Sequence, residues 1–277
     1  MMTDTLQGKT LFITGGSRGI GREIALRAAA NGANVVIAAK TSEPHPKLPG
    51  TIHSTVAEIE AAGGQGLALM LDVRDADAVE AAVAQAAGHF GGIDAVVNNA
   101  GAISLTPLAE TGVKRFDLMM QINVRAVFVT AKAALPYLRK SANPHILSLS
   151  PPLNFGTPWL KPYIPYTVTK YAMTILSLGL AEELRADGIA VNTLWPKTTI
   201  ATAAVEHEVD ASLIARSRHP AIMADAAHAI LTSPADTFTG QTTIDEDVLR
   251  ARGVTDFSAY CIDPQVEDLA LDLYVDP

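Results

Sequence analysis

The chain has 277 residues, of which 48% are hydrophobic and 18% are charged. This length and composition suffice for the core of one α/β domain and exclude a globally disordered chain. The formal net charge of −8, with no stripe of Lys or Arg, argues against a nucleic-acid partner. A single cysteine, Cys261, excludes internal disulfides and metal–cysteine clusters.

The N-terminal segment lacks the features of a targeting sequence. Residues 1–8 have neither the basic nor the apolar region of a signal peptide. No uninterrupted apolar run approaches the roughly 18 residues of a membrane span. We therefore expect a cytoplasmic protein without a membrane span.

Short apolar runs alternate with stretches of helical periodicity. The predicted strands are Thr10–Thr14, Asn34–Ala39, Gly66–Asp72, Ala95–Asn98, His145–Ser150 and Ala190–Trp195, with a last one near 240–245. The predicted helices are Gly19–Asn31, Thr51–Ala62, Ala76–Phe90, Val113–Tyr137 and Pro165–Asp187. This alternation predicts one Rossmann-type domain over residues 1–277, a doubly wound parallel sheet with helices on both faces.

The first predicted strand leads directly into a glycine-rich turn, TGGSRGIG at residues 14–21. Glycines let the backbone approach phosphates closely, and the following helix N-terminus attracts anions. The spacing is Gly-x3-Gly-x-Gly, which differs from the commoner Gly-x-Gly-x2-Gly of dinucleotide sites. The turn predicts a dinucleotide pyrophosphate site, with a purely structural turn as the alternative.

Tyr166 and Lys170 are spaced to lie on one face of a predicted helix. A phenol, with a pKa of about 10, is a poor acid or base at neutral pH. A neighbouring ammonium favours the phenolate, so Lys170 is expected to lower the pKa of Tyr166. Tyr163 and Tyr171 have no lysine four residues later. The alternative is a chance pair on an exposed helix.

These motifs together resemble one family. The turn, the Asn98–Gly101 segment, Asn123 and the Tyr166/Lys170 pair occur in the order and separation of the short-chain dehydrogenase/reductase family. The resemblance covers about residues 8–245. Residues 145–152 and 195–198 further resemble its hydroxysteroid dehydrogenase-like branch. Some animal members of that branch carry an added sterol-carrier domain, which we do not expect in this chain.

The resemblance implies hydride transfer between a nicotinamide and an alcohol or carbonyl substrate. Tyr166 would be the general acid and base, Lys170 would tune it and bind the nicotinamide ribose, and Asn123 would hold a relay water. No metal is implied. The implied cofactor-binding residues are Gly15, Ser17, Arg18, Gly19, Ile20, Gly21, Lys40, Asp72, Val73, Asn99, Ala100, Gly101, Tyr166, Lys170, Pro196, Thr198 and Thr199.

The end of the second predicted strand favours NADP as the cofactor. NAD-specific members place an acidic residue there for the ribose 2′-hydroxyl. This chain has Ala39 followed by Lys40, and Arg18 adds a second cation that could accept a 2′-phosphate. The alternative is that both cations are solvated surface charges.

One family residue is displaced. A serine after the fifth strand orients the substrate carbonyl in the family, and a gap-free match places Pro151 there. Ser150 is the candidate replacement, although strand alternation turns it to the opposite face from residue 151. A missing donor motivates the alternative function, an NADP-binding sensor or scaffold with little catalysis. Lys197, where the family has glycine, could approach an anion or point into solvent, and we favour solvent.

Four further segments complete the expectations. Residues 41–49, with three prolines, are expected to form a surface loop, with a cofactor lid as the alternative. A helix within 199–219 is expected to cover the substrate site, and the tail, 246–277, to pack on the surface or at a subunit contact. Apolar residues within 151–165 suggest an apolar substrate, although they could equally pack a lid. The resemblance further implies a homodimer or homotetramer through the two long helices, Val113–Tyr137 and Pro165–Asp187.

Overall fold

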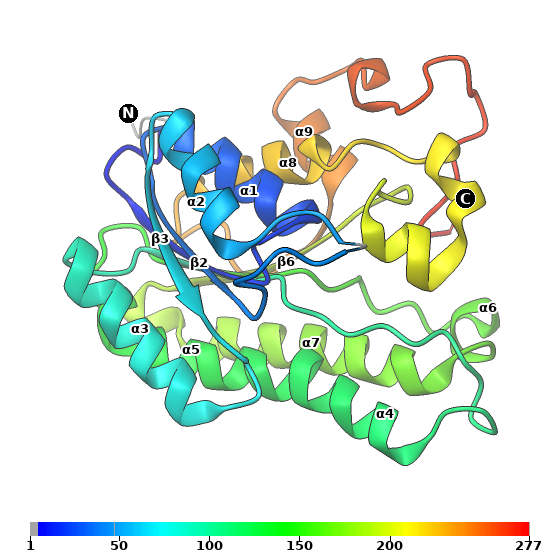
Figure 1. Ribbon diagram of the computed structural model, residues 1–277, viewed down its shortest axis with the longest axis horizontal. Coiled ribbons are helices and arrows are strands. Elements are labelled where there is room, and N and C mark those ends of the chain that lie inside the picture. Colours follow the sequence, from blue (N-terminus) through cyan, green and yellow to red (C-terminus); the bar gives the residue numbers. More distant parts are fainter. Residues whose placement is uncertain (1–4, 47, 277) are drawn as a thin grey trace.

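The centre of the computed structural model, which describes residues 5–46 and 48–276, is a seven-stranded parallel sheet (Figure 1). Its strand order is β3-β2-β1-β4-β5-β6-β7. The strands are β1 (Thr10–Thr14), β2 (Asn34–Ala39), β3 (Gln65–Met70), β4 (Ala95–Asn98), β5 (His145–Ser148), β6 (Ala190–Trp195) and β7 (Thr242–Ile244). The order reverses between β1 and β4, which is where doubly wound sheets bind ligands. The predicted fold class is confirmed.

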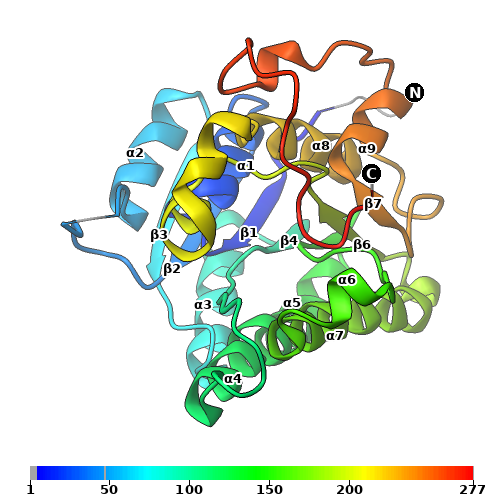
Figure 2. The same cartoon turned by 90° about the vertical axis from the view of Figure 1, so that its right-hand side faces the viewer.

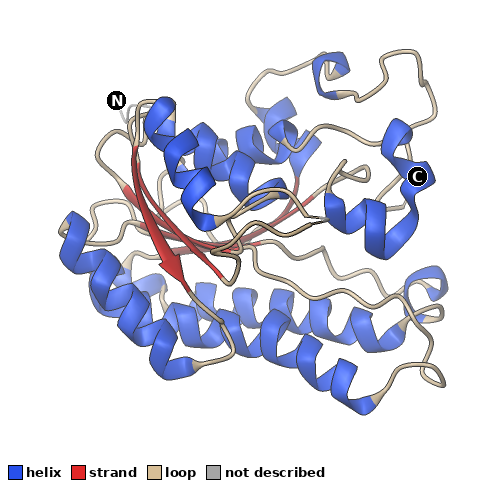
Figure 3. Ribbon diagram, viewed as in Figure 1, coloured by secondary structure: helices blue, strands red, loops and turns tan. Residues whose placement is uncertain are grey.

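Helices cover both faces of this sheet (Figures 1 and 3). One layer contains α1 (Gly19–Ala29), α2 (Ile52–Ala61), α8 (Ala221–Leu231) and α9 (Asp245–Ala251). The opposite layer contains α3 (Ala76–Phe90), α4 (Val113–Met119), α5 (Ala126–Leu138) and α7 (Ile164–Glu183). A one-turn helix, α6 (Thr157–Leu160), precedes α7.

Strand alternation divides the core into two halves. Leu11 and Ile13 on β1 are fully buried with α1 and α8 on one side of the sheet. Phe12, between them, is fully buried with α3 and α5 on the other side. Successive side chains of a strand point to opposite faces, so an apolar run such as this one is buried on both sides.

The helical run Val113–Leu138 is the only one in the described ranges long and apolar enough, by length and composition, to cross a membrane. Its α5 part packs against α3 and the sheet through buried residues that include Ala131 and Ala134. A helix in the core layer of an α/β domain accounts for this apolar character. Between α4 and α5 the run passes through a π-helical segment, Met120–Arg125.

Several predicted boundaries differ from the structure. β3 ends at Met70 and β5 at Ser148, so Asp72 and Ser150 lie in the turns beyond the strands. At β5 the Ser150 amide donates to the Ser148 carbonyl (3.0 Å), which closes a tight turn. The helix expected within 199–219 consists of a π-helical piece, Val205–Asp210, and a 3-10 piece, Ala211–Arg216.

The C-terminal segment, defined here as residues 270–276, returns to the carboxyl ends of the strands (Figure 2). Leu271 forms an antiparallel bridge with Thr198, directly after β6. Tyr274 is only 1% exposed and packs against Tyr171, at 5.1 Å between ring centroids. The segment packs on the surface with Leu271 and Asp276 exposed, while the Tyr274 ring is enclosed by Trp159, Tyr171 and Trp195.

Candidate active site

A cleft of about 550 Å³ opens at the carboxyl ends of the strands. It brings together most of the residues predicted from sequence. The predicted residues that line it are Gly15, Ser17, Arg18, Gly19, Ile20, Lys40, Asp72, Val73, Asn99, Ala100, Gly101, Tyr166 and Lys170. Across the described part of the chain, no group of three or more His, Cys, Asp or Glu side chains could hold a metal ion.

The glycine turn closely approaches the segment after β4. The Asn99 Nδ2 donates to the carbonyls of Thr14 (3.0 Å) and Gly15 (2.8 Å). Gly15 has φ +68°, and a Cβ there would lie 2.8 Å from the Ala100 Cα. A Cβ on Gly21 would lie 2.4 Å from the Asn99 Nδ2, so a glycine is needed there for the Asn99 side chain to pack against the turn. The turn thus leaves the room that a dinucleotide phosphate needs.

The 41–49 segment forms part of the cleft wall. Thr41 and Leu48 line the cleft. The Arg18 guanidinium donates to the carbonyls of Pro49 (2.9 Å) and Gly50 (3.0 Å). Residues 43–46 are exposed, as expected of a surface loop, while Pro49 at its end is bonded to the glycine turn.

Positive charge predominates at the end of β2. Lys40 lies 3.3 Å from the Asp72 carboxylate and keeps 64% of its side chain exposed. Arg74 also pairs with Asp72, and hydrogen bonds from Arg74 are the main cause that lowers the pKa of this carboxyl. Ala39 contributes no charge. Together with Arg18, the three cations outnumber the one carboxylate.

Tyr166 and Lys170 come from the first turns of α7 and are both buried. Burial raises the pKa of Tyr166 well above its usual value, and negative charge on Tyr274, Asp272 and Tyr163 acts in the same direction. The expected lowering by the lysine is not found: burial is the largest influence on Tyr166, and Lys170 is not among the groups that shift its pKa. Burial also lowers the pKa of Lys170 to about 8.

The ammonium group of Lys170 has a defined position. Its Nζ donates to the Leu149 carbonyl (2.8 Å), just beyond β5. It also lies 4.9 Å from the ring centroid of Trp195, at the end of β6. Leu149 and Trp195 line the same cleft, although neither is among the cofactor-binding residues that the resemblance implies.

Asn123 lies in the π-helical segment and is fully buried. Its Oδ1 accepts from the Ala102 amide (2.8 Å), and its Nδ2 donates to the Ala102 carbonyl (2.9 Å) and the Thr169 hydroxyl (2.9 Å). The side chain therefore ties the segment after β4 to α7, one residue before Lys170. It does not line the cleft itself.

Ser150 does not reach the cleft. Its side chain is fully buried, and its Oγ accepts from the Thr174 hydroxyl (3.0 Å) on α7. Neither Ser150 nor Pro151 contributes to the cleft lining. The structure therefore does not place Ser150 as the expected carbonyl donor, because the turn after Ser148 directs it into the sheet–helix interface.

Three predicted cofactor residues after β6 also lie outside the lining, namely Pro196, Thr198 and Thr199. The C-terminal segment pairs with this stretch, and the Thr199 amide donates to the Ala270 carbonyl (2.9 Å). The lining near them comes from the stretch after Ile200, which has no recognisable motif. Its cleft-lining residues are Thr202, Ala203, Ala204, His207 and Glu208.

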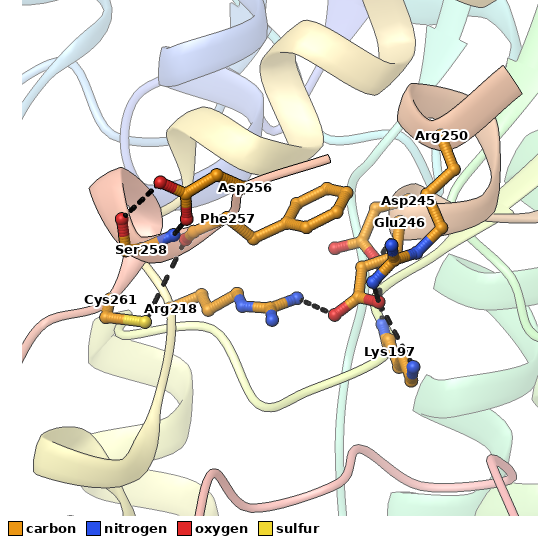
Figure 4. A network of polar contacts seen from close by, with 9 residues as sticks. All are labelled: Lys197, Arg218, Asp245, Glu246, Arg250, Asp256, Phe257, Ser258 and Cys261. Carbon is orange, nitrogen blue, oxygen red and sulfur yellow. Dashed lines mark hydrogen bonds and ion pairs between the residues drawn. The ribbon is translucent and has the colours of Figure 1, made fainter. Parts of the chain in front are cut away.

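Lys197 does not point freely into solvent as expected. Its Nζ lies 3.1 Å from the Glu246 carboxylate, which also pairs with Arg218 and Arg250 (Figure 4). Its backbone amide donates to the Asp245 Oδ1 (2.9 Å). The stretch after β6 is thereby fixed to the start of α9.

Comparison with known proteins identifies the family. The model of the short chain dehydrogenase family matches residues 9–212. The chain belongs to the short-chain dehydrogenase/reductase family. This is a family of NAD(P)-dependent oxidoreductases, which agrees with a glycine turn and a tyrosine–lysine pair on one cleft.

The relatives of this short-chain dehydrogenase include hydroxysteroid dehydrogenase-like protein 2 of Danio rerio, 54% identical over 95% of the chain. The Homo sapiens protein of the same name is 51% identical over 95%. The chain spans 63% and 62% of the lengths of these two relatives. Both the predicted family and the resemblance to its hydroxysteroid dehydrogenase-like branch are confirmed.

Solved structures show the same fold. A Xanthomonas campestris protein described as a dehydrogenase has a TM-score of 0.94 and 54% identity, covering 99% of this chain and 100% of its own. A metagenomic short-chain oxidoreductase in complex with NADP has a TM-score of 0.72 and 25% identity, covering 87% of this chain and 98% of its own.

Proposed function

We propose that the chain is an NADP-dependent oxidoreductase that interconverts an alcohol and a carbonyl, with Tyr166 as the general acid and base. One observation carries this proposal: Tyr166 and Lys170 line the same cleft as the glycine turn. A buried phenol and a buried ammonium have a use beside a hydride carrier, whereas a purely structural turn needs neither.

The residues of the chain account for the proton chemistry. Burial keeps the proton on Tyr166, which suits donation to the oxygen of a carbonyl that is being reduced. Lys170, fixed by the Leu149 carbonyl, supplies the positive charge that offsets a developing phenolate. Asn123 positions this part of α7 through Thr169. A bound NADPH would supply the hydride and be oxidised to NADP, with the glycine turn and Lys40 as the residues that hold it.

The proposal is tested with a panel of aldehydes and ketones and NADPH. Tyr166→Phe removes the proton donor, so turnover should fall by at least ~10³-fold while NADPH affinity stays nearly constant. Tyr163→Phe is the matched control, because Tyr163 precedes α7 and has no lysine four residues later. Residual Tyr166→Phe activity within tenfold of wild type would refute the role. Tight NADPH binding by the wild type with no turnover would instead support the sensor or scaffold alternative.

Preference for NADP is supported by the charges at the end of β2. Lys40 and Arg18 line the cleft there, and no acid occupies Ala39. Lys40→Ala and Arg18→Ala should each weaken NADPH binding about tenfold and leave NADH binding nearly unchanged. Arg22→Ala is the control, because Arg22 pairs with Glu58 and does not line the cleft. Tighter binding of NADH than NADPH by the wild type would contradict the proposal.

An apolar substrate is supported by the side chains around Tyr166. Ile103, Leu149 and Trp195 line the cleft together with Tyr166, whereas the apolar residues within 151–165 do not. Such walls favour a hydrocarbon-bearing carbonyl over a small polar one. In the panel, kcat/KM should rise with the length of an aliphatic chain. A flat or falling series would contradict this substrate class.

A homo-oligomer is supported by exposed apolar side chains on α5 and α7. Phe128, Val168 and Ile175 are 50%, 44% and 58% exposed. Apolar residues gathered on neighbouring helices are typical of a subunit contact. Light scattering should report a dimer or tetramer that Phe128→Glu and Ile175→Glu dissociate. A wild-type monomer would contradict it.

A further inference from the structure

The C-terminal segment brings Asp272 next to the stretch that follows β6. The Asp272 amide donates to the Lys197 carbonyl (3.0 Å), and Leu271 pairs with Thr198. This pairing aligns the segment antiparallel to the stretch after β6. Asp272 therefore lies at the carboxyl end of β6, where Trp195 contacts Lys170.

Trp195 joins the segment to Lys170. The Lys170 Nζ lies 4.9 Å from the centroid of its ring, and its Nε1 donates to the Leu273 carbonyl (2.8 Å). Leu273 follows Asp272, whose carboxylate accepts from the Leu273 amide (2.7 Å). One buried ring thus has the ammonium over its face and, at its edge, the backbone of the residue next to Asp272.

The charged and titratable groups around Asp272 come from several elements. Lys170 and Tyr166 act from α7, Tyr163 from the residue before it, Tyr274 from the segment itself, and Asp245 from α9. The pKa of Asp272 is raised to about 7, mainly by burial; Asp245 acts in the same direction, while the Leu273 amide and Lys170 oppose them. The Asp272 carboxylate is the charge that raises the pKa of Lys170 against burial.

We propose that Asp272 is a positioning residue whose carboxylate keeps Lys170 protonated beside Tyr166. This inference rests on the proposed roles of Tyr166 and Lys170. It assigns the C-terminal segment a part in the active site besides covering it. An ammonium in a mostly buried site needs such a counter-charge, because desolvation favours the neutral amine.

The sign of the effect follows from the charge. Asp272→Asn removes a negative charge near both groups, which lowers the pKa of Lys170 and of Tyr166. In the pH–rate profile of carbonyl reduction, the alkaline limb should therefore move about one unit to lower pH. At pH values above this limb, the rate should fall about tenfold. Because Asp272 is ionised only above about pH 7, the variant-to-wild-type rate ratio should fall as pH rises through that value.

Three variants separate charge from structure. Asp272→Glu keeps the charge and should return the limb toward its wild-type position. Asp276→Asn is the matched structural control. Asp276 anchors the same segment through the Trp159 Nε1 (2.9 Å) and the Asn154 Nδ2 (2.8 Å). Its loss should raise KM without moving the limb. Asp272→Ala is a second variant without the charge, to be used if Asp272→Asn does not fold.

A measurement without turnover separates this inference from the proposed function. Competitive acetylation of the Lys170 amine, followed by mass spectrometry across pH 6–10, reports its pKa directly. A lower Lys170 pKa in Asp272→Asn without turnover of any carbonyl would support the coupling and refute the enzyme function. Turnover with an unmoved Lys170 pKa, or an equal shift in Asp276→Asn, would overturn the role of Asp272.

Discussion

The nucleotide side of the cleft and its substrate side are built in different ways. On the nucleotide side, the ends of neighbouring strands meet, and Asn99 and the Ala100 amide tie the turn at Thr14 and Gly15 to the segment after β4. On the substrate side, residues far apart in sequence close the site: Trp159 bonds Asp276, 117 positions away. The nucleotide side depends on the close approach of backbone segments, whereas the substrate side depends on the C-terminal segment, which folds back onto the strand ends.

This difference determines where each side is vulnerable. A glycine turn tolerates little added volume, because backbone and side-chain atoms already lie within contact distance. The substrate side tolerates change at individual positions but loses its shape if the C-terminal segment leaves. Variants in the two regions should therefore fail differently, the first in cofactor affinity and the second in stability and substrate affinity.

The largest expected effect is on the substrate side. Tyr274→Ala removes a fully buried ring and should lower the free energy of unfolding by about 3–5 kcal/mol. Tyr274→Phe is the control. It keeps the ring and loses only the contact of the hydroxyl with Thr167 (3.2 Å), which costs about 1 kcal/mol. Urea unfolding measures both, and equal losses would show that the ring does not anchor the segment.

The next effect tests the nucleotide side. Gly21→Ala places a Cβ 2.4 Å from the Asn99 Nδ2, so the side chain that holds the turn must shift. Overpacking of this kind costs about 1–3 kcal/mol, and NADPH affinity should fall about 10–100-fold. Gly88→Ala in α3 has nothing within 4 Å of its added Cβ and should leave affinity unchanged. Fluorescence titration with NADPH separates the two, and similar affinities would contradict the close-approach argument.

The same difference explains what the sequence predicts. The glycine turn, Asn99, Tyr166 and Lys170 are recognisable because their chemistry is encoded in short spacings. Asp272 and Tyr274 have no such spacing, since their partners lie on α7 and β6. The stretch that contains Pro196, Thr198 and Thr199 pairs with the C-terminal segment, a long-range contact that no short spacing predicts.

The smallest effect concerns the one motif residue on which sequence and structure disagree most. If Ser150 donated to the substrate carbonyl, Ser150→Ala should cost ~10²–10³ in kcat. Its Oγ instead accepts from Thr174 inside the sheet–helix interface. Ser150→Ala should therefore cost about 1 kcal/mol of stability and no more than about threefold in kcat. Steady-state kinetics of Ser150→Ala beside Thr174→Val decide the matter. A similar, small change of kcat in both variants would show that Ser150 has a packing role. A large loss of kcat in Ser150→Ala alone would show that Ser150 acts in catalysis.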